Sequence, residues 1–216
     1  MLANFIGVTE DLFLGFGQNC IIFAVTLLLA LPLGLLISFG TLSKFKPLKV
    51  VLDGIIWVIR GTPLMLQIFV VYYVPGLVFH WSAPQELFAV CVAFTINYAC
   101  YFSVIYRGGI QGVPRGQYEA SQVLGLNRKQ TFRRIVLPQV VKRILPPMSN
   151  EIITLVKDTS LANVIGLSEI ILSAQSFARV SGIIWPLFYS GLFFLLFNGI
   201  LTLLFGYAER KMSYYR

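Results

Sequence analysis

Two acidic side chains interrupt an otherwise apolar stretch in the C-terminal half of the chain. Glu151, Thr154 and Asp158 are spaced i, i+3 and i+7, which places them on one face of a helix. If this helix crosses a membrane, each charge costs about 2.5–3.5 kcal/mol on insertion scales and needs a functional reason. A stripe with two carboxylates suits a cation, so these residues, with the neighbouring Asn150, are predicted to bind a cationic ligand. The alternative is that Lys157 neutralises Asp158 and that the acidic side chain only braces a helix turn.

A second apolar stretch is broken by Arg60-Gly61-Thr62-Pro63. A break of this kind exposes backbone N–H groups at the start of a half-helix, and such groups favour a carboxylate. Gly61 and Thr62, together with Gln67, are therefore predicted to hold the anionic end of a ligand. The alternative is a simple kink, with Arg60 reaching to the membrane interface.

Other polar residues give weaker indications. Asn97, Tyr98 and Tyr101 lie in a third apolar stretch; Tyr98 in particular is expected to line the same cavity, although such residues often form hydrogen bonds between helices. The chain has one histidine, and its three cysteines all fall in apolar stretches. Neither pattern indicates a metal site or disulfides, so no metal or cofactor is expected on this chain.

The elements that must position these residues are membrane-spanning helices. Of the 216 residues, 57% are hydrophobic and 12% are charged, a far larger apolar share than is usual for soluble domains. Each of five stretches holds roughly 20 residues, enough for a helix to cross about 30 Å of hydrocarbon. Three are continuous, and charged residues interrupt the second and fourth. The five predicted spans are Cys20–Phe39, Leu52–Val74, Leu87–Tyr106, Ile144–Leu167 and Ile183–Tyr207.

The positive charge of the chain is unevenly distributed along these spans. Fourteen of the 17 basic residues fall in the connections after the first and third spans or after the fifth, the last group including Arg216. By the positive-inside rule this side is the cytoplasm, with the N-terminus outside and the C-terminus inside. Topology therefore explains the net charge of +8, and nucleic-acid binding is not needed to explain it.

The connection from Gly116 to Pro138 is long, polar and patterned. Residues 118–124 read as a short helix, with Gly125 as the residue that follows its end. Asn127 suits the N-cap of a second helix over residues 128–136, which Leu137-Pro138 is expected to close because proline cannot continue a helix comfortably. A further amphipathic helix is predicted over residues 168–180, on the outer face.

The polar connection resembles the EAA loop of ATP-binding-cassette (ABC) importer permeases. The shared features are Glu119-Ala120-Ser121, Gly125 and the Ile-x-Leu-Pro ending, with Ser121 in place of the second alanine. In that family the loop carries a coupling helix that docks in a cleft of a cytoplasmic ATPase subunit. The resemblance therefore implies an ATPase-coupling role for Glu119, Ala120, Ser121, Leu124 and Gly125.

Four shorter motifs resemble the polar amino-acid branch of this family. They are Arg60-Gly61-Thr62-Pro63-Leu64, Gly116-Gln117-x-Glu119-Ala120, Leu137-Pro138-Gln139 and Lys157-Asp158-Thr159-Ser160-Leu161. The resemblance implies an all-α membrane protein of the type I importer fold with five transmembrane helices. On this reading residues 1–216 form a single transmembrane permease domain, with residues 116–138 as its cytoplasmic coupling loop. The expected location is the bacterial cytoplasmic membrane, crossed several times.

The resemblance also implies partners. Two ATPase subunits supply ATP and Mg²⁺ sites, since this chain has no G-x-x-x-x-G-K-[ST] phosphate loop and cannot hydrolyse ATP itself. A second permease subunit is expected, most simply a second copy of this chain, together with an extracytoplasmic amino-acid-binding protein and the membrane lipid. The acidic stripe then indicates arginine, lysine or histidine as cargo, with glutamine or another neutral polar amino acid as the alternative.

Two further classes of function stay open on the residues alone. In a proton-coupled secondary transporter, Glu151 and Asp158 would carry protons, although such carriers usually have more helices or inverted repeats. A channel or membrane scaffold would not need a docking loop.

Overall fold

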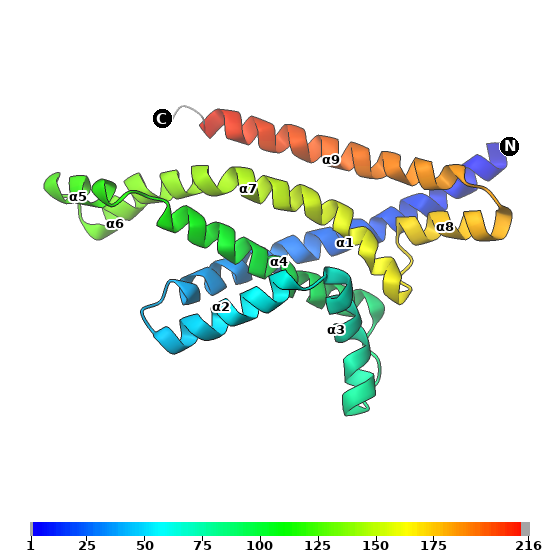
Figure 1. Cartoon of the computed structure of the whole chain (residues 1–216). Helices are drawn as coiled ribbons and strands as arrows, with labels where there is room; N and C mark the ends of the chain where they lie inside the picture. Colours follow the sequence, from blue (N-terminus) through cyan, green and yellow to red (C-terminus); the bar gives the residue numbers. More distant parts are fainter. Residues whose placement is uncertain (1, 213–216) are drawn as a thin grey trace.

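The computed structural model describes residues 2–212 and is helical throughout its regular elements, with no strand in that range (Figure 1). Side chains are described from Phe5 onward. Arg216, counted above with the C-terminal basic residues, lies outside the described residues, as do the two ends of the predicted 1–216 domain.

Three helices are long and apolar enough to cross a membrane: α1 (Leu2–Thr41), α4 (Glu86–Gln111) and α9 (Trp185–Met212). The first two contain the first and third predicted spans, and α9 covers the fifth apart from its first two residues, Ile183 and Ile184. The 40 residues of α1 correspond to about 60 Å of helix at 1.5 Å per residue. This length exceeds a bilayer core of about 30 Å, so α1 extends well beyond its predicted span.

The second predicted span is two helices rather than one. Helix α2 (Lys46–Gly61) and helix α3 (Leu64–Phe79) meet at a bend of 105°, and α3 projects from the body of the molecule in Figure 1. Thr62 has extended backbone angles, and Pro63 follows as the N-cap of α3. Proline disfavours the helical conformation of the residue before it, so the helix stops and restarts here. The predicted break is confirmed, and its angle is much larger than that of a kink.

The fourth predicted span begins within α7 (Leu137–Asp158) and continues through the 3₁₀ helix η2 (Thr159–Ile165). The chain then bends by 52° into α8 (Ile170–Ser181). This helix confirms the amphipathic helix predicted over residues 168–180. Each of the two bent pairs counts as one more candidate span, giving up to five within residues 2–212.

The polar connection folds as two short helices, as the sequence predicts, with different bounds: α5 is Arg115–Val123 instead of 118–124, and α6 is Arg128–Thr131 instead of 128–136. The expected stop at Leu137-Pro138 is wrong. The chain passes through a π-helical turn, η1 (Phe132–Val136), and runs directly into α7. In this turn the Leu137 N–H bonds to the Phe132 carbonyl, five residues back. The wider turn accommodates Pro138, which has no N–H to donate to residue 134.

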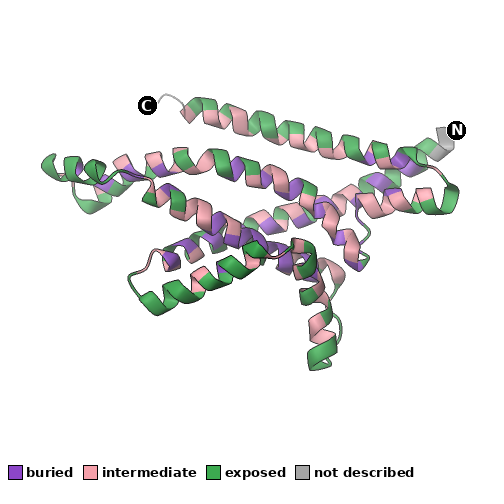
Figure 2. Ribbon diagram, viewed as in Figure 1, coloured by how far each residue is buried: buried purple, intermediate pink, exposed green. Residues whose placement is uncertain are grey.

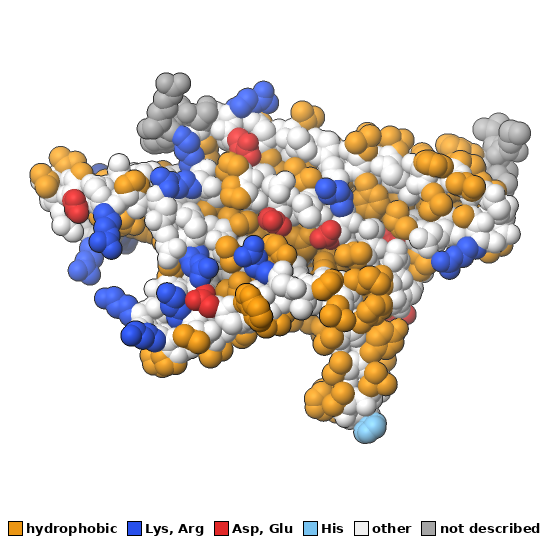
Figure 3. All heavy atoms as spheres, in the orientation of Figure 1, with side chains coloured by type: hydrophobic (Ala, Val, Ile, Leu, Met, Phe, Trp, Pro, Cys, Tyr) orange, Lys and Arg blue, Asp and Glu red, His pale blue; other side chains and the backbone are white. Residues whose placement is uncertain are grey.

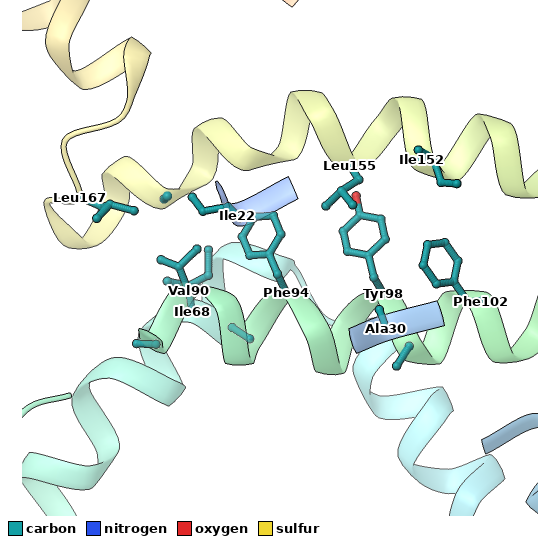
Figure 4. Packing of buried hydrophobic residues seen from close by; sticks show 14 of the residues in the cluster. Ile22, Ala30, Ile68, Val90, Phe94, Tyr98, Phe102, Ile152, Leu155 and Leu167 are labelled. Atoms are coloured by element: carbon teal, nitrogen blue, oxygen red, sulfur yellow. The ribbon is translucent and has the colours of Figure 1, made fainter. Parts of the chain in front are cut away.

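The core lies where α4 packs against α1, α3 and α7 (Figure 2). In Figure 4, Phe94, Tyr98 and Phe102 extend from α4 toward Leu155 and Ile152 of α7. A Cβ on Gly34 of α1 would lie 2.9 Å from the Ala99 carbonyl oxygen, so α1 and α4 approach as closely as small residues permit. By contrast, much of α9 faces outward, consistent with contact with lipid.

Candidate functional site

The acidic stripe faces a hollow of about 400 Å³ between α4, α7 and the α2–α3 break. We call this space the central hollow. It is lined by Glu151, Thr154 and Asp158 of α7, by Asn97, Tyr98 and Tyr101 of α4, and by Thr62, Pro63, Leu64 and Leu161. The structure therefore brings together three stretches of sequence that are separated by 30 residues or more.

Within the hollow, a hydrogen bond fixes the carboxylate of Asp158, whereas the carboxylate of Glu151 is available to a ligand. The Tyr98 hydroxyl donates to Asp158 Oδ2 at 2.7 Å. Glu151 has no hydrogen-bond or ion-pair partner within the described residues. Asn150 lies just outside the lining and is exposed, and its carbonyl oxygen accepts a bond from the Thr154 hydroxyl. The predicted i, i+3, i+7 face is thus present, and Asn150 contributes to it only through its backbone.

The residues predicted to hold an anion, Gly61, Thr62 and Gln67, do not all line the central hollow. Thr62 lines the central hollow, next to the first turn of α3. Gln67 is absent from this lining, because its amide donates to the Ile59 carbonyl at 2.7 Å and to both oxygens of Thr62. Its own carbonyl accepts from Asn97 at 3.0 Å. Gln67 braces the break, and a direct contact with a ligand in this hollow would require it to release these bonds.

Gly61 faces a second space, the proximal hollow of about 480 Å³ between α2 and α4, on the side nearer α5. Asp53, Trp57, Arg60 and Arg107 also line it. Arg107 donates to Asp53 at 2.7 Å. Sequence reasoning missed this ion pair, since 54 residues separate its members and no local spacing indicates the contact.

Arg60 connects the two hollows. Its guanidinium lies 4.9 Å from the centre of the Tyr101 ring, a cation–π distance, and Tyr101 lines the central hollow. Arg60 therefore places a positive charge beside the carboxylates.

A buried carboxylate holds the C-terminal end of α7 in place. Glu169 is 0% exposed and caps α8, accepting from the Ile171 and Leu172 N–H groups. Asn19 of α1 donates to Glu169 at 3.2 Å and to Thr159 at 2.9 Å. Thr159 follows Asp158 directly, so this cluster fixes the segment that carries the hollow's second acidic group. Glutamate is not among the preferred N-cap residues, so the sequence gives no clear signal for this cap.

The polar connection forms a compact elbow at one end of the molecule. Gly125 adopts a φ of +71°, which favours glycine, and Asn127 and Gln130 form a reciprocal capping box. Ser121 is buried, where it accepts a 3.0 Å bond from Thr131 and so joins α5 to α6.

The exposed surface of this elbow is partly apolar. Val123 and Leu124 are 89% and 74% exposed, and Glu119 and Ala120 also face outward. In Figure 3 this end of the molecule carries hydrophobic and charged side chains together. Within residues 2–212 no cluster of three or more potential metal ligands is found.

A known protein family accounts for this combination of a polar central hollow and a surface elbow. The sequence profile of the family described as "Binding-protein-dependent transport system inner membrane component" matches residues 30–214. The chain belongs to this family. As such it is the membrane component of a transport system and not an enzyme, and ATP hydrolysis belongs to a separate subunit.

Individual relatives agree with this assignment. The chain is 35% identical to the arginine transport system permease protein ArtQ of Bacillus subtilis, covering 89% of this chain and 88% of the relative. It is 33% identical to the glutamate/glutamine/aspartate/asparagine transport system permease protein BztC of Rhodobacter capsulatus, over 95% of this chain and 49% of the relative.

A solved structure matches the fold. It is described as an amino acid ABC transporter with histidines, and its matching chain superposes with a TM-score of 0.87 at 28% identity, covering 98% of each chain. The fold is therefore that of the type I importer permeases.

Proposed function

We propose that this chain is the permease subunit of an ATP-driven importer of basic amino acids. The observation that carries the proposal is the pairing of Glu151 and Asp158 on one wall of the central hollow. A volume of about 400 Å³ is suitable for one amino acid. Relatives that carry arginine support a basic cargo, and BztC supports the alternative of glutamine or another polar amino acid.

The two ends of such a cargo differ in charge, and the hollow offers a partner for each. Glu151, free of internal partners, accepts the guanidinium, ammonium or imidazolium group, and Asp158 adds a second negative charge. The α-carboxylate lies by the first turn of α3 near Thr62, where backbone N–H groups are available.

The elbow is proposed to couple this chain to the ATPase. We assign residues 116–138 as the coupling loop and Glu119, Ala120, Ser121, Leu124 and Gly125 as its ATPase-coupling residues. The exposed Val123 and Leu124 would fill an apolar cleft of the ATPase, and the basic residues beside the elbow support a cytoplasmic position for it. The N-terminus is then outside and the C-terminus inside a bacterial cytoplasmic membrane.

The proposed assembly has two copies of this chain and two ATPase subunits, which hold ATP and Mg²⁺. An extracytoplasmic binding protein delivers the amino acid. No cofactor is assigned to this chain itself.

The test is uptake by the complete complex in proteoliposomes. ATP-dependent uptake of arginine, lysine, histidine, glutamine and glutamate is compared for the wild type, Glu151→Gln and Glu10→Gln, whose side chain is exposed near the start of α1. We expect arginine, lysine or histidine to be preferred, and Glu151→Gln to lower that uptake at least about tenfold, as loss of a charge-assisted contact predicts. Glu10→Gln should behave as the wild type.

Two results would contradict the proposal. Preferred uptake of glutamine, unaffected by Glu151→Gln, would assign the neutral cargo. Uptake driven by a proton gradient without ATP would instead favour a secondary transporter.

A further inference from the structure

A third space, the distal hollow, lies at the end of the bundle away from the elbow and has a volume of about 460 Å³. Gln18 of α1, Tyr72 of α3, Gln85 and Glu86 at the start of α4, and Leu167 after η2 contribute to its lining. Nothing in the assigned transport mechanism uses these residues.

Two acceptor groups of the distal hollow, on Gln18 and Glu86, are unmatched within the described residues. The Gln18 Oε1 atom is buried and has no hydrogen-bond partner in the described part of the chain. Glu86 makes no ion pair within residues 2–212, and its Oε1 lies 4.0 Å from where a Cβ on Gly166 would be. No basic side chain is among the described residues that line this space. A buried acceptor without a donor is rare in folded proteins and calls for an explanation. A cationic donor would satisfy both groups.

The distal and central hollows share the same walls. Helix α3 contributes Tyr72 to the distal hollow and Leu64 to the central one, and α4 contributes Leu87 and Tyr98 respectively. Leu87 and Tyr98 are 11 residues apart, close to three helical turns, so they lie on nearly the same face of α4. The two hollows therefore follow one another along one side of the bundle.

An apolar layer separates the two hollows on each shared element. Ile68 lies between the two lining residues of α3, Val90 and Phe94 lie between those of α4, and Ile165 lies between Leu161 and Leu167. All four are buried and belong to one core cluster. Figure 4 shows Val90 and Phe94 on α4 with Ile68 and Leu167 beside them. This layer is the apolar seal.

We propose that the distal hollow is a receiving site, where Glu86 and Gln18 bind the cationic end of a basic amino acid before it passes the apolar seal into the central hollow. The proposal rests on the proposed function of import. It gives the transported molecule an acidic partner on each side of the seal. A cation would otherwise meet an apolar barrier with no intermediate site.

Protection of an introduced thiol tests this site in the complete permease–ATPase complex without binding protein. Ala83→Cys, at an exposed residue that lines the distal hollow, is made with Cys20, Cys91 and Cys100 replaced by alanine, and its reaction with a cationic thiol reagent is timed with and without saturating L-arginine. Ser82→Cys is the matched control, because it is exposed in the loop before α4 but does not line the hollow. We expect arginine to slow the Ala83→Cys reaction about fivefold or more by occupancy, and to leave Ser82→Cys unchanged.

Two further variants separate this site from the central one. Arginine should still protect Ala83→Cys when Glu151→Gln is added, and should fail to protect it when Glu86→Gln is added. Glu86→Gln alone should raise the KM for arginine uptake, which also shows that the variant folds and assembles.

The overturning results are distinct. Absence of arginine protection, in a wild-type complex that transports arginine, sinks the receiving site and leaves the proposed function intact. Protection that persists with Glu86→Gln also contradicts the receiving site. Protection that appears only when the binding protein is added, with or without arginine, contradicts it as well and would indicate a protein-docking surface. A wild-type complex that neither transports nor is protected by arginine overturns both proposals.

Discussion

The hydroxyl of Tyr98 donates a 2.7 Å hydrogen bond to Asp158 across the interface between α4 and α7. The two residues are 60 positions apart, and Tyr98 is only 2% exposed. Its ring stands among Phe94, Tyr101 and Phe102, so the hydroxyl has little freedom to turn away. A buried aromatic residue thus fixes the direction of one of the two carboxylates of the central hollow.

Removing this hydroxyl should weaken cargo binding with little effect on folding. Tyr98→Phe keeps the ring and deletes one hydrogen bond to a charged group, worth about 1.5–3 kcal/mol. Since water in the hollow can partly replace the bond, we expect a rise of about threefold to tenfold in the KM for arginine. Tyr106→Phe, on the same helix but outside the hollow, is the matched control. Equal KM values for both variants in proteoliposome uptake would contradict a positioning role for Tyr98.

Gln67 should behave as a brace of the α2–α3 break. Gln67→Ala removes the bonds to Ile59 and Thr62 and leaves Asn97 without its acceptor. We expect a loss of about 1–3 kcal/mol in stability, measured as a lower Tm of the detergent-solubilised complex. Gln111→Ala, an exposed position at the end of α4, should leave the Tm unchanged. An unaltered Tm for Gln67→Ala, together with a raised KM, would instead support the direct ligand contact predicted from the sequence.

The different outcomes for Glu151 and Gln67 show what the sequence can predict. Helical periodicity places Glu151, Thr154 and Asp158 on one face, and that face lines the hollow because α7 is a regular helix. Gln67 lies next to a break, where the side chain meets backbone groups released by the bend itself. Its partners Ile59 and Asn97 depend on the 105° angle, which no local pattern specifies. For the same reason, no local sequence pattern predicted the Asp53–Arg107 ion pair or the π-helical turn before Pro138.

The elbow should depend on the conformation of one glycine. Gly125→Ala places a Cβ in open space but at a φ of +71°, a left-handed conformation that costs an L-residue about 1–2 kcal/mol. We expect impaired coupling, measured as lower ATPase stimulation by loaded binding protein with arginine binding unchanged. Gly125→Asn should be affected less, because asparagine tolerates this conformation.

Gly116→Ala is the control for that experiment. Gly116 lies in α5 with no positive φ, and a Cβ there also meets nothing within 4 Å. The substitution should therefore be neutral or slightly stabilising. If both alanine variants couple normally, the conformation at Gly125 does not matter for transmission.

The last prediction concerns Glu169, which holds together three elements behind the central hollow. Glu169→Ala leaves the first N–H groups of α8 and the amide of Asn19 without their acceptor in a buried place. Lost caps cost about 0.5–2 kcal/mol, and an orphaned buried donor adds about 1–3 kcal/mol. We therefore expect a Tm several degrees lower, with partial recovery in Glu169→Gln, which keeps one acceptor oxygen. The neighbouring exposed Ser168→Ala should match the wild type. Asn19 also bonds Thr159, next to Asp158, so the weakened cluster should raise the KM for arginine as well. A lower Tm with an unchanged KM would mean that the cluster supports the fold without positioning the site.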